Sequence, residues 1–326
     1  MAEEGQGIVQ RVVDRIDRFQ RAHAWAGFPL AVAKKFGEDQ AGNLAALVAY
    51  YGFFALLPLL LALVTVLGFV LSGNPQMQER IVDSALANFP VIGDQLRDNV
   101  GSLEGSGVAL AIGLGGLVWA GLGAVQAMQN AMNGVWSVAF RDRPGFVQAK
   151  LRGLVMLVVL GGGAILTTAL AGAGAGLERL GPIARVFGLG LSLGVNTGLF
   201  LLAFKVLTDA DVSWRQLLPG ATVAGAAWVA LQALGGLYVS NRLQGASQTY
   251  GVFAVVIGLL SWLFLQAQIT LLAAELNVVR VRKLWPRQLG SGGTLTDADR
   301  RALTSSAKVE ERIPEETVDV DLPKRA

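Results

Sequence analysis

The charged residues of this chain are separated by six long uncharged stretches, and these stretches limit the possible folds more than any other feature. In chain order they lie between residues 39 and 79, 104 and 141, 152 and 178, 185 and 205, 215 and 242, and 242 and 275. Five of the six contain at least 25 residues. Because about 20 apolar residues suffice for a helix to cross the hydrocarbon core of a bilayer, the pattern predicts an all-α integral membrane bundle of six transmembrane helices.

The composition agrees with a membrane protein and excludes most soluble classes. Hydrophobic residues make up 53% of the chain and charged residues 16%, whereas soluble chains carry about 25% charged residues. A soluble enzyme or a DNA-binding module is therefore effectively excluded, and we expect no nucleic-acid partner. The chain has no cysteine and one histidine, His23, so it lacks thiolate ligands, disulfides and a cysteine nucleophile. We expect no metal site, no cofactor and no enzymatic activity.

The predicted boundaries divide the chain into three regions. Residues 1–43 form a cytoplasmic amphipathic region, and because they lack the short apolar core of a signal peptide we expect them to be retained. Residues 44–279 form the membrane domain, and residues 280–326 form a basic juxtamembrane segment and a disordered tail, since no apolar periodicity survives there. The spans are predicted at about 44–71, 108–128, 153–177, 186–204, 217–240 and 252–275, with an outer amphipathic loop at 75–104.

Lysine and arginine predict the orientation of the spans. The two terminal regions and the connections on the same side hold 22 of these residues, and the alternate connections hold five. Short cytoplasmic loops accumulate positive charge, so both termini are predicted to be cytoplasmic. The net charge of +3 then indicates contact with anionic lipid headgroups at the cytoplasmic face.

The N-terminal region contains an amphipathic segment. Apolar residues at positions 8, 12, 16 and 19 share one helical face, and arginines and aspartates occupy much of the rest. Two interpretations fit this pattern. The helix either lies in the membrane interface or docks on the cytoplasmic ends of the bundle.

A stripe of four amide side chains is the most informative polar cluster. Gln126, Gln129, Asn130 and Asn133 are offset by three, four and seven residues, which places them on one helical face. Lipid cannot satisfy their hydrogen bonds, so the stripe is expected to face the bundle interior or water. It either lines a polar cavity, bonds helices to one another, or emerges at the cytoplasmic surface.

Four further polar residues are candidates for a cavity lining: Asn196, Gln266, Glu275 and Asn277. Glu275 adjoins a long apolar run and sits near the end of the sixth span. A carboxylate at that depth either carries protons or holds a cation, or it pairs with a neighbouring arginine. Asn196 either bonds another helix or forms part of a cavity wall.

Two other features concern helix shape and packing. Pro58 lies near the middle of the first span, where it removes a backbone hydrogen bond and is expected to kink the helix. Gly190, Gly194 and Gly198 are spaced four apart in the fourth span, an interval that lets helix backbones approach closely. Packing within the bundle and homo-oligomer formation are both compatible with these glycines.

Several segments resemble one known family. The first span, AALVAYYGFFALLPLLLALVTVLG, and the later blocks VSWRQLLPGATVAGAAW, GLYVSN and YGVFAVVIGLLSWLFLQAQITLLAAELN are similar to the YihY/virulence factor BrkB family, bacterial inner-membrane proteins once misnamed ribonuclease BN. The resemblance extends over roughly residues 28–282. It implies a six-helix all-α fold, both ends in the cytoplasm and a place in the bacterial cytoplasmic membrane. Family-like positions of unassigned role are Tyr50, Tyr51, Pro58, Asn130, Pro219, Gly220, Tyr250, Gly251, Glu275 and Asn277.

Three functional hypotheses follow. A transporter or flippase-like protein for a lipid or lipid-linked envelope component is favoured by the amide stripe, Pro58 and Glu275, although the chain has no evident inverted repeat. A non-catalytic membrane scaffold or envelope assembly factor is the alternative. Ribonuclease activity is not expected, because metal-dependent nucleases need converging carboxylates and the acidic residues here lie in loops and in the tail.

Overall fold

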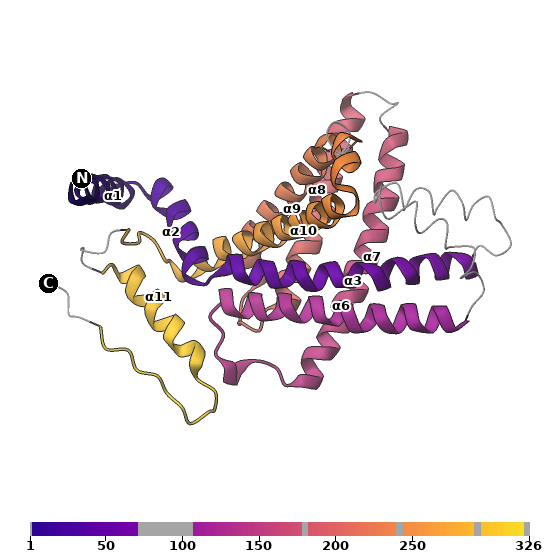
Figure 1. The fold of residues 1–326 in the computed structure, drawn as a ribbon. Helices are drawn as coiled ribbons and strands as arrows, with labels where there is room; N and C mark the ends of the chain where they lie inside the picture. The colour runs from indigo at the N-terminus through magenta and orange to yellow at the C-terminus, as the bar shows by residue number, and fades with distance from the viewer. Residues whose placement is uncertain (1, 71–106, 178–181, 239–243, 290–294, 323–326) are drawn as a thin grey trace. The chain divides into compact units, whose positions relative to one another are not determined.

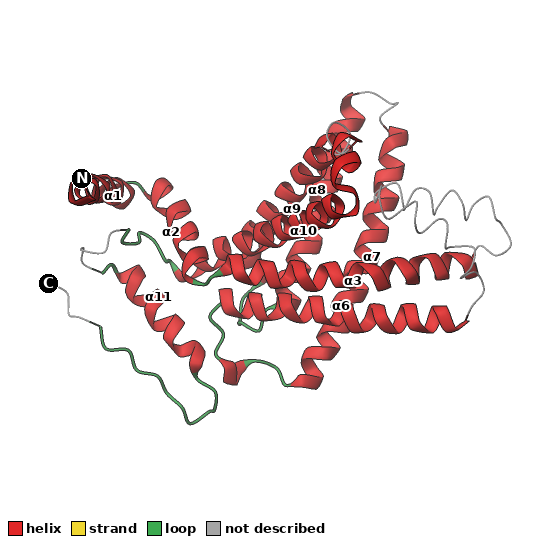
Figure 2. Cartoon of the chain, viewed as in Figure 1, coloured by secondary structure: helices red, strands yellow, loops and turns green. Residues whose placement is uncertain are grey.

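The computed structural model describes residues 2–70, 107–177, 182–238, 244–289 and 295–322. Within these ranges the regular structure is helical and contains no strand (Figures 1 and 2). The all-α prediction is therefore confirmed for the described part of the chain. The predicted outer loop at 75–104 lies outside it.

Six long helices follow the uncharged stretches of the sequence. They are α3 (Ala41–Val70), α6 (Gly107–Val135), α7 (Phe146–Leu177), α8 (Pro182–Leu207), α9 (Trp214–Tyr238) and α10 (Gln244–Arg282). Each predicted span falls in one of these helices, apart from end residues that are not described. Among the described residues, the segments Val186–Leu207 and Val256–Arg282 are long and apolar enough to cross a membrane, each with a mean hydropathy of 1.8.

Shorter helices form the two terminal regions. Helix α1 (Ala2–Ala22) and helix α2 (Ala24–Glu38) precede α3. A 3-10 turn, η1 (Phe140–Asp142), joins α6 to α7, and α11 (Asp297–Ala307) is followed by a second turn, η4 (Lys308–Glu310).

The tail requires a correction of the sequence prediction. Residues 280–282 complete α10, and Leu284, Arg287 and Gln288 beyond it are buried. Helix α11 begins with a capping box in which Thr296 and Asp299 bond each other's backbone N–H groups. This segment is held by a cap and polar contacts instead of a broad apolar face, so a search for apolar periodicity does not detect it.

The chain forms two compact units. The first comprises Met1–Ala45, Met128–Leu231 and Gln268–Ala326, and the second comprises Ala46–Ala127 and Gln232–Ala267. The charged and polar clusters described below lie in the first unit.

Within the second unit, α3 and α6 approach closely at two points. A Cβ built on Gly123 would lie 3.2 Å from the Cδ1 of Tyr51, and one built on Gly116 would lie 3.3 Å from the Cβ of Pro58. The partners run in opposite directions along the two helices, seven residues apart in each, as expected for an antiparallel pair. Pro58 lies inside the continuous helix α3, and its ring forms part of this packing contact.

Within the first unit, close approach occurs at glycines other than those predicted. A Cβ on Gly163 of α7 would lie 2.6 Å from the Leu199 side chain, and one on Gly225 of α9 would lie 2.9 Å from Thr197. By contrast, a Cβ on any of the three predicted packing glycines, Gly190, Gly194 and Gly198, meets no described atom within 4 Å. Spacing alone does not reveal which face of a helix meets its neighbour.

Candidate functional site

A buried group of charged side chains lies where α2 and α10 meet the C-terminal end of α6. The Nζ of Lys35 forms an ion pair with Asp39, lies 3.8 Å from the Oε2 of Glu275, and donates to the carbonyl oxygen of Val135 at 3.1 Å. The side chains of Lys35 and Glu275 are 4% and 0% exposed. Val135 is the last residue of α6, so Lys35 also satisfies a carbonyl that has no partner within that helix.

A second cation completes this group. The guanidinium of Arg282 donates to the carbonyl oxygen of Trp136 and interacts electrostatically with Asp39 and Glu275. Two cations therefore face two carboxylates. We call Lys35, Asp39, Glu275 and Arg282 the ion cluster.

Glu275 is the least well satisfied member of the ion cluster. Neither of its carboxylate oxygens accepts a hydrogen bond in the described structure, and its ion pair with Lys35 is longer than that between Lys35 and Asp39. Burial of a carboxylate without hydrogen bonds is costly. Ionisable residues kept in such positions within membrane segments commonly serve a function.

Asn277, two residues further along α10, is committed to helix packing. Its Oδ1 accepts from the backbone N of Gly220 at 2.8 Å, and its Nδ2 donates to the carbonyl oxygen of Leu217 at 3.0 Å. Asn277 is fully buried, and the neighbouring Pro219 has no backbone N–H to donate. The side chain thus links α10 to the first turns of α9.

Asn133 belongs to a separate polar group at the end of α6. Its Nδ2 donates to Asp209 Oδ2 at 2.7 Å, and its Oδ1 accepts from the backbone N of Asp209 at 3.0 Å. Asp209 also pairs with Arg152 of α7. Asn133 therefore joins α6, α7 and the loop that follows α8.

The remaining amide candidates differ in exposure. Gln129 is buried, Gln126 and Gln266 are half-buried, and Asn130 is exposed. Asn196 donates from its Nδ2 to the carbonyl oxygen of Ser192, one turn earlier in α8, at 2.8 Å. Two of the predicted residues, Asn133 and Asn277, thus bond other elements, and Asn196 bonds its own helix.

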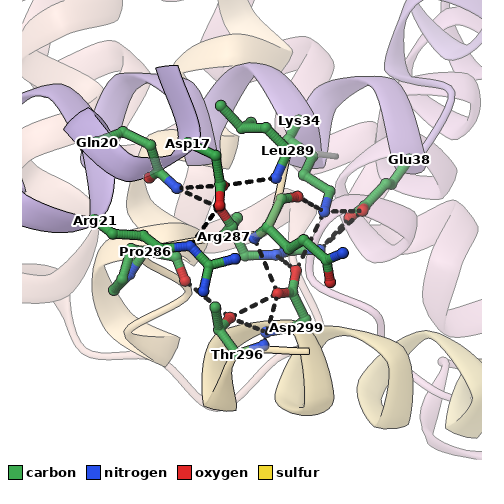
Figure 3. Close-up of polar contacts among 11 residues, drawn as sticks. Asp17, Gln20, Arg21, Lys34, Glu38, Pro286, Arg287, Leu289, Thr296 and Asp299 are labelled. Atoms are coloured by element: carbon green, nitrogen blue, oxygen red, sulfur yellow. Dashed lines mark hydrogen bonds and ion pairs between the residues drawn. The ribbon is translucent and has the colours of Figure 1, made fainter. Parts of the chain in front are cut away.

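Sequence reasoning missed a second charged network, which we call the clasp (Figure 3). At its centre the Nε of Arg287 lies 2.7 Å from Asp299 Oδ1, and its Nη2 lies 2.7 Å from Glu38 Oε2. The Nζ of Lys34 lies 3.2 Å from the same Asp299 oxygen. The clasp therefore ties α2 to α11 and to the segment that follows α10.

Helix α1 joins the clasp through two polar side chains. Asp17 Oδ1 accepts from the backbone N of Leu289 at 3.0 Å, and Gln20 Nε2 donates to the carbonyl oxygen of Arg287. A Cβ on Gly27 would lie 2.8 Å from the carbonyl oxygen of Gln20, so a glycine here lets α1 and α2 meet closely.

The electrostatics of Asp299 reflect its place in the clasp. Burial raises the pKa of its carboxyl, but hydrogen bonds from Thr296, Arg287 and two backbone N–H groups outweigh that effect and hold the pKa well below its ordinary value. One feature of the sequence could have predicted the helix that carries Asp299. Thr296 and Asp299 fit the capping-box spacing of a helix N-terminus.

Comparison with known proteins places this chain in a membrane-protein family. A family profile described as Virulence factor BrkB matches residues 32–290. The chain is 30% identical over 267 residues to a UPF0761 membrane protein of Alkalilimnicola ehrlichii, with 76% of this chain and 57% of that protein covered. It is 23% identical over 316 residues to the inner membrane protein YhjD of Escherichia coli, with 89% of this chain and 92% of that protein covered.

The coverage differs between these relatives. The matched part spans little more than half of the Alkalilimnicola protein and 64% of a UPF0761 membrane protein of Pseudomonas aeruginosa that is 26% identical. No solved structure gave a significant match. The family profile covers most of the chain, and we conclude that this membrane protein belongs to the Virulence factor BrkB family.

Proposed function

We propose that this chain crosses the bacterial inner membrane six times with both termini in the cytoplasm, and that it transports or flips a lipid or lipid-linked envelope component without catalysing a reaction. Six long helices coincide with the six uncharged stretches. The bias of 22 cationic residues against five supports the orientation. The Escherichia coli relative is named an inner membrane protein, which supports the location.

The burial of Glu275 is the observation that carries the transport proposal. The residue lies in the apolar segment Val256–Arg282, is 0% exposed, and accepts no hydrogen bond from the described residues. A group of this kind is stabilised when it takes up a proton, a cation or the cationic part of a substrate.

Lys35 gives the ion cluster two possible pairings. Its Nζ forms an ion pair with Asp39, which precedes α3, and lies 3.8 Å from the Oε2 of Glu275 in α10. When Glu275 is neutralised, Lys35 pairs with Asp39 alone; when Glu275 is charged, it holds Lys35 toward α10. Uptake of a proton, a cation or a cationic substrate group by Glu275 would thereby change the contact between the N-terminal region and α10. Coupling of binding to a conformational change requires such a link.

Reconstitution tests this proposal. The purified chain is placed in liposomes containing a trace of phospholipid with a fluorescent headgroup, and a membrane-impermeant reductant reports the rate at which inner-leaflet label reaches the outside. We expect faster movement than in protein-free liposomes, and a roughly tenfold slower rate for Glu275→Gln, equivalent to about 1.4 kcal/mol. Glu315→Gln, at an exposed position in the tail, is the matched control and should retain the wild-type rate.

A scaffold or assembly factor is the second candidate, and the packing amides favour it. Asn133 and Asn277 use both ends of their amides in bonds to other elements, as expected for polar residues that hold a bundle together. If liposomes containing the wild-type protein showed the same rate of phospholipid movement as protein-free liposomes for every headgroup tried, transport would be contradicted. A stable partner recovered by cross-linking would then support the scaffold.

A further inference from the structure

Helix α1 presents an apolar face that the described structure leaves exposed. Val12, Ile16 and Phe19 are spaced four and three residues apart, so they lie on one face. Their exposed fractions are 51%, 43% and 47%. Trp25, at the start of α2, is 72% exposed and packs edge-on against Phe19 with the ring centroids 5.9 Å apart, so it extends this face.

The side of α1 that docks on the protein is polar. Asp17 and Gln20 make the contacts with Leu289 and Arg287 described above, and Gln20 is 1% exposed. At 100° per residue, this docking side lies roughly a quarter of a turn from the apolar face. A helix that only covered a protein core would bury its apolar face and leave the polar side in water.

From the other edge of the apolar face, cationic side chains continue around α1 toward its far side. Arg15 and Arg18 are exposed, and helical geometry places Arg15 beside the Val12–Ile16 row. The clasp also holds α1 near the end of a candidate span, because Arg287 follows Arg282, the last residue of α10, by five positions.

We propose that the face formed by Val12, Ile16, Phe19 and Trp25 lies in the cytoplasmic leaflet, with Arg15 and Arg18 against anionic phospholipid headgroups, and that the clasp sets this orientation. Charge complementarity selects an anionic lipid surface as the occupant. An exposed tryptophan beside an apolar face is typical of the membrane–water interface. The proposal rests on the cytoplasmic N-terminus proposed above, but it does not depend on transport activity.

Single-cysteine labelling tests this contact in the full chain, which has no cysteine of its own. Ile16→Cys is labelled with an environment-sensitive fluorophore and reconstituted in vesicles of phosphatidylcholine and phosphatidylglycerol. Asp14→Cys, on the far side of α1 and exposed, is the matched control. We expect a lipid-borne quencher to act on the label at position 16 and aqueous iodide to act on the label at position 14.

The proposed need for anionic phospholipid gives a second test, separate from the comparison of positions 16 and 14. In phosphatidylcholine alone, quenching at position 16 by the lipid-borne quencher should fall. In the mixed vesicles, Arg15→Gln and Arg18→Gln should each lower the ratio of membrane-bound to detached α1 about fivefold. A label at position 16 that iodide reaches as readily as at position 14 would overturn the proposal. Protection of position 16 from both quenchers would also overturn it, by indicating a protein partner such as a second copy.

Discussion

The Nε of Arg287 lies 2.7 Å from the Oδ1 of Asp299, and the two side chains are 2% and 3% exposed. This pair connects the segment after α10 to the first turn of α11, where Asp299 also closes the capping box with Thr296. One carboxylate thus serves both the local stability of α11 and its attachment to the rest of the first unit. Among the described residues, a buried Arg287 without Asp299 would keep Glu38, whose side chain is 39% exposed, as its ion-pair partner, so its charge would be less well compensated.

Asp299→Asn should release α11. We expect a loss of about 3 kcal/mol in the local stability of this helix, because the substitution removes the charge that pairs with Arg287 and Lys34. Amide hydrogen exchange of residues 297–307 in the detergent-solubilised protein measures the effect as an approximately hundredfold acceleration. Asp319→Asn, at an exposed position further along the tail, should leave the exchange of α11 unchanged.

The same helix should depend on pH through Asp299. The pKa of this carboxyl is lower in the folded protein than in the unfolded chain, so its contribution to stability is present above the unfolded pKa and is lost as the pH falls toward the folded pKa. Protection of α11, corrected for intrinsic exchange, should therefore stay constant from neutral pH to about pH 4 and decline below it. Wild-type and Asp299→Asn proteins that show the same pH dependence would contradict this assignment.

Gly220→Ala should destabilise the contact between α9 and α10. A Cβ at this position would overlap the Asn277 side chain and the carbonyl oxygen of Ala273, and overpacking of this kind costs about 2 kcal/mol. The midpoint of thermal unfolding in detergent measures the loss. Gly194→Ala is the matched control, because its Cβ meets no described atom, and its midpoint should be unchanged or slightly higher. Equal midpoints for the two variants would refute the packing argument.

The proposed topology predicts which loops face the cell exterior. Ser213 precedes α9 in a connection predicted to be cytoplasmic, and Ser102 belongs to the predicted outer loop, outside the described residues. In intact spheroplasts, a membrane-impermeant maleimide should label Ser102→Cys and should label Ser213→Cys only after permeabilisation. Labelling of Ser213→Cys from outside would require a different topology.

The sequence was informative wherever a signal is local. Uncharged runs predicted the positions of the long helices, because apolar length and the absence of charge are properties of a continuous segment. The capping-box spacing of Thr296 and Asp299 is local too, and a search for caps would have found α11.

The contacts of the site are not local, and the sequence could not supply them. Asn133 was recognised as a polar candidate, but its partner Asp209 lies 76 residues away. Arg287 pairs with Glu38 across 249 positions, and no periodicity records such a pairing. The packing glycines illustrate the same limit, since Gly163 and Gly225 meet neighbours whereas the regularly spaced Gly194 does not.

The pairing of Lys35 with Glu275 is the most direct target for testing the proposed function. Lys35→Met, Glu275→Gln and the double variant are compared for phospholipid movement at equal amounts of folded, reconstituted protein. We expect each single substitution to slow phospholipid movement about tenfold and the double variant to be no slower than Glu275→Gln, because the two groups act through one interaction. Wild-type rates in all three variants would contradict a role for this pair in moving lipid.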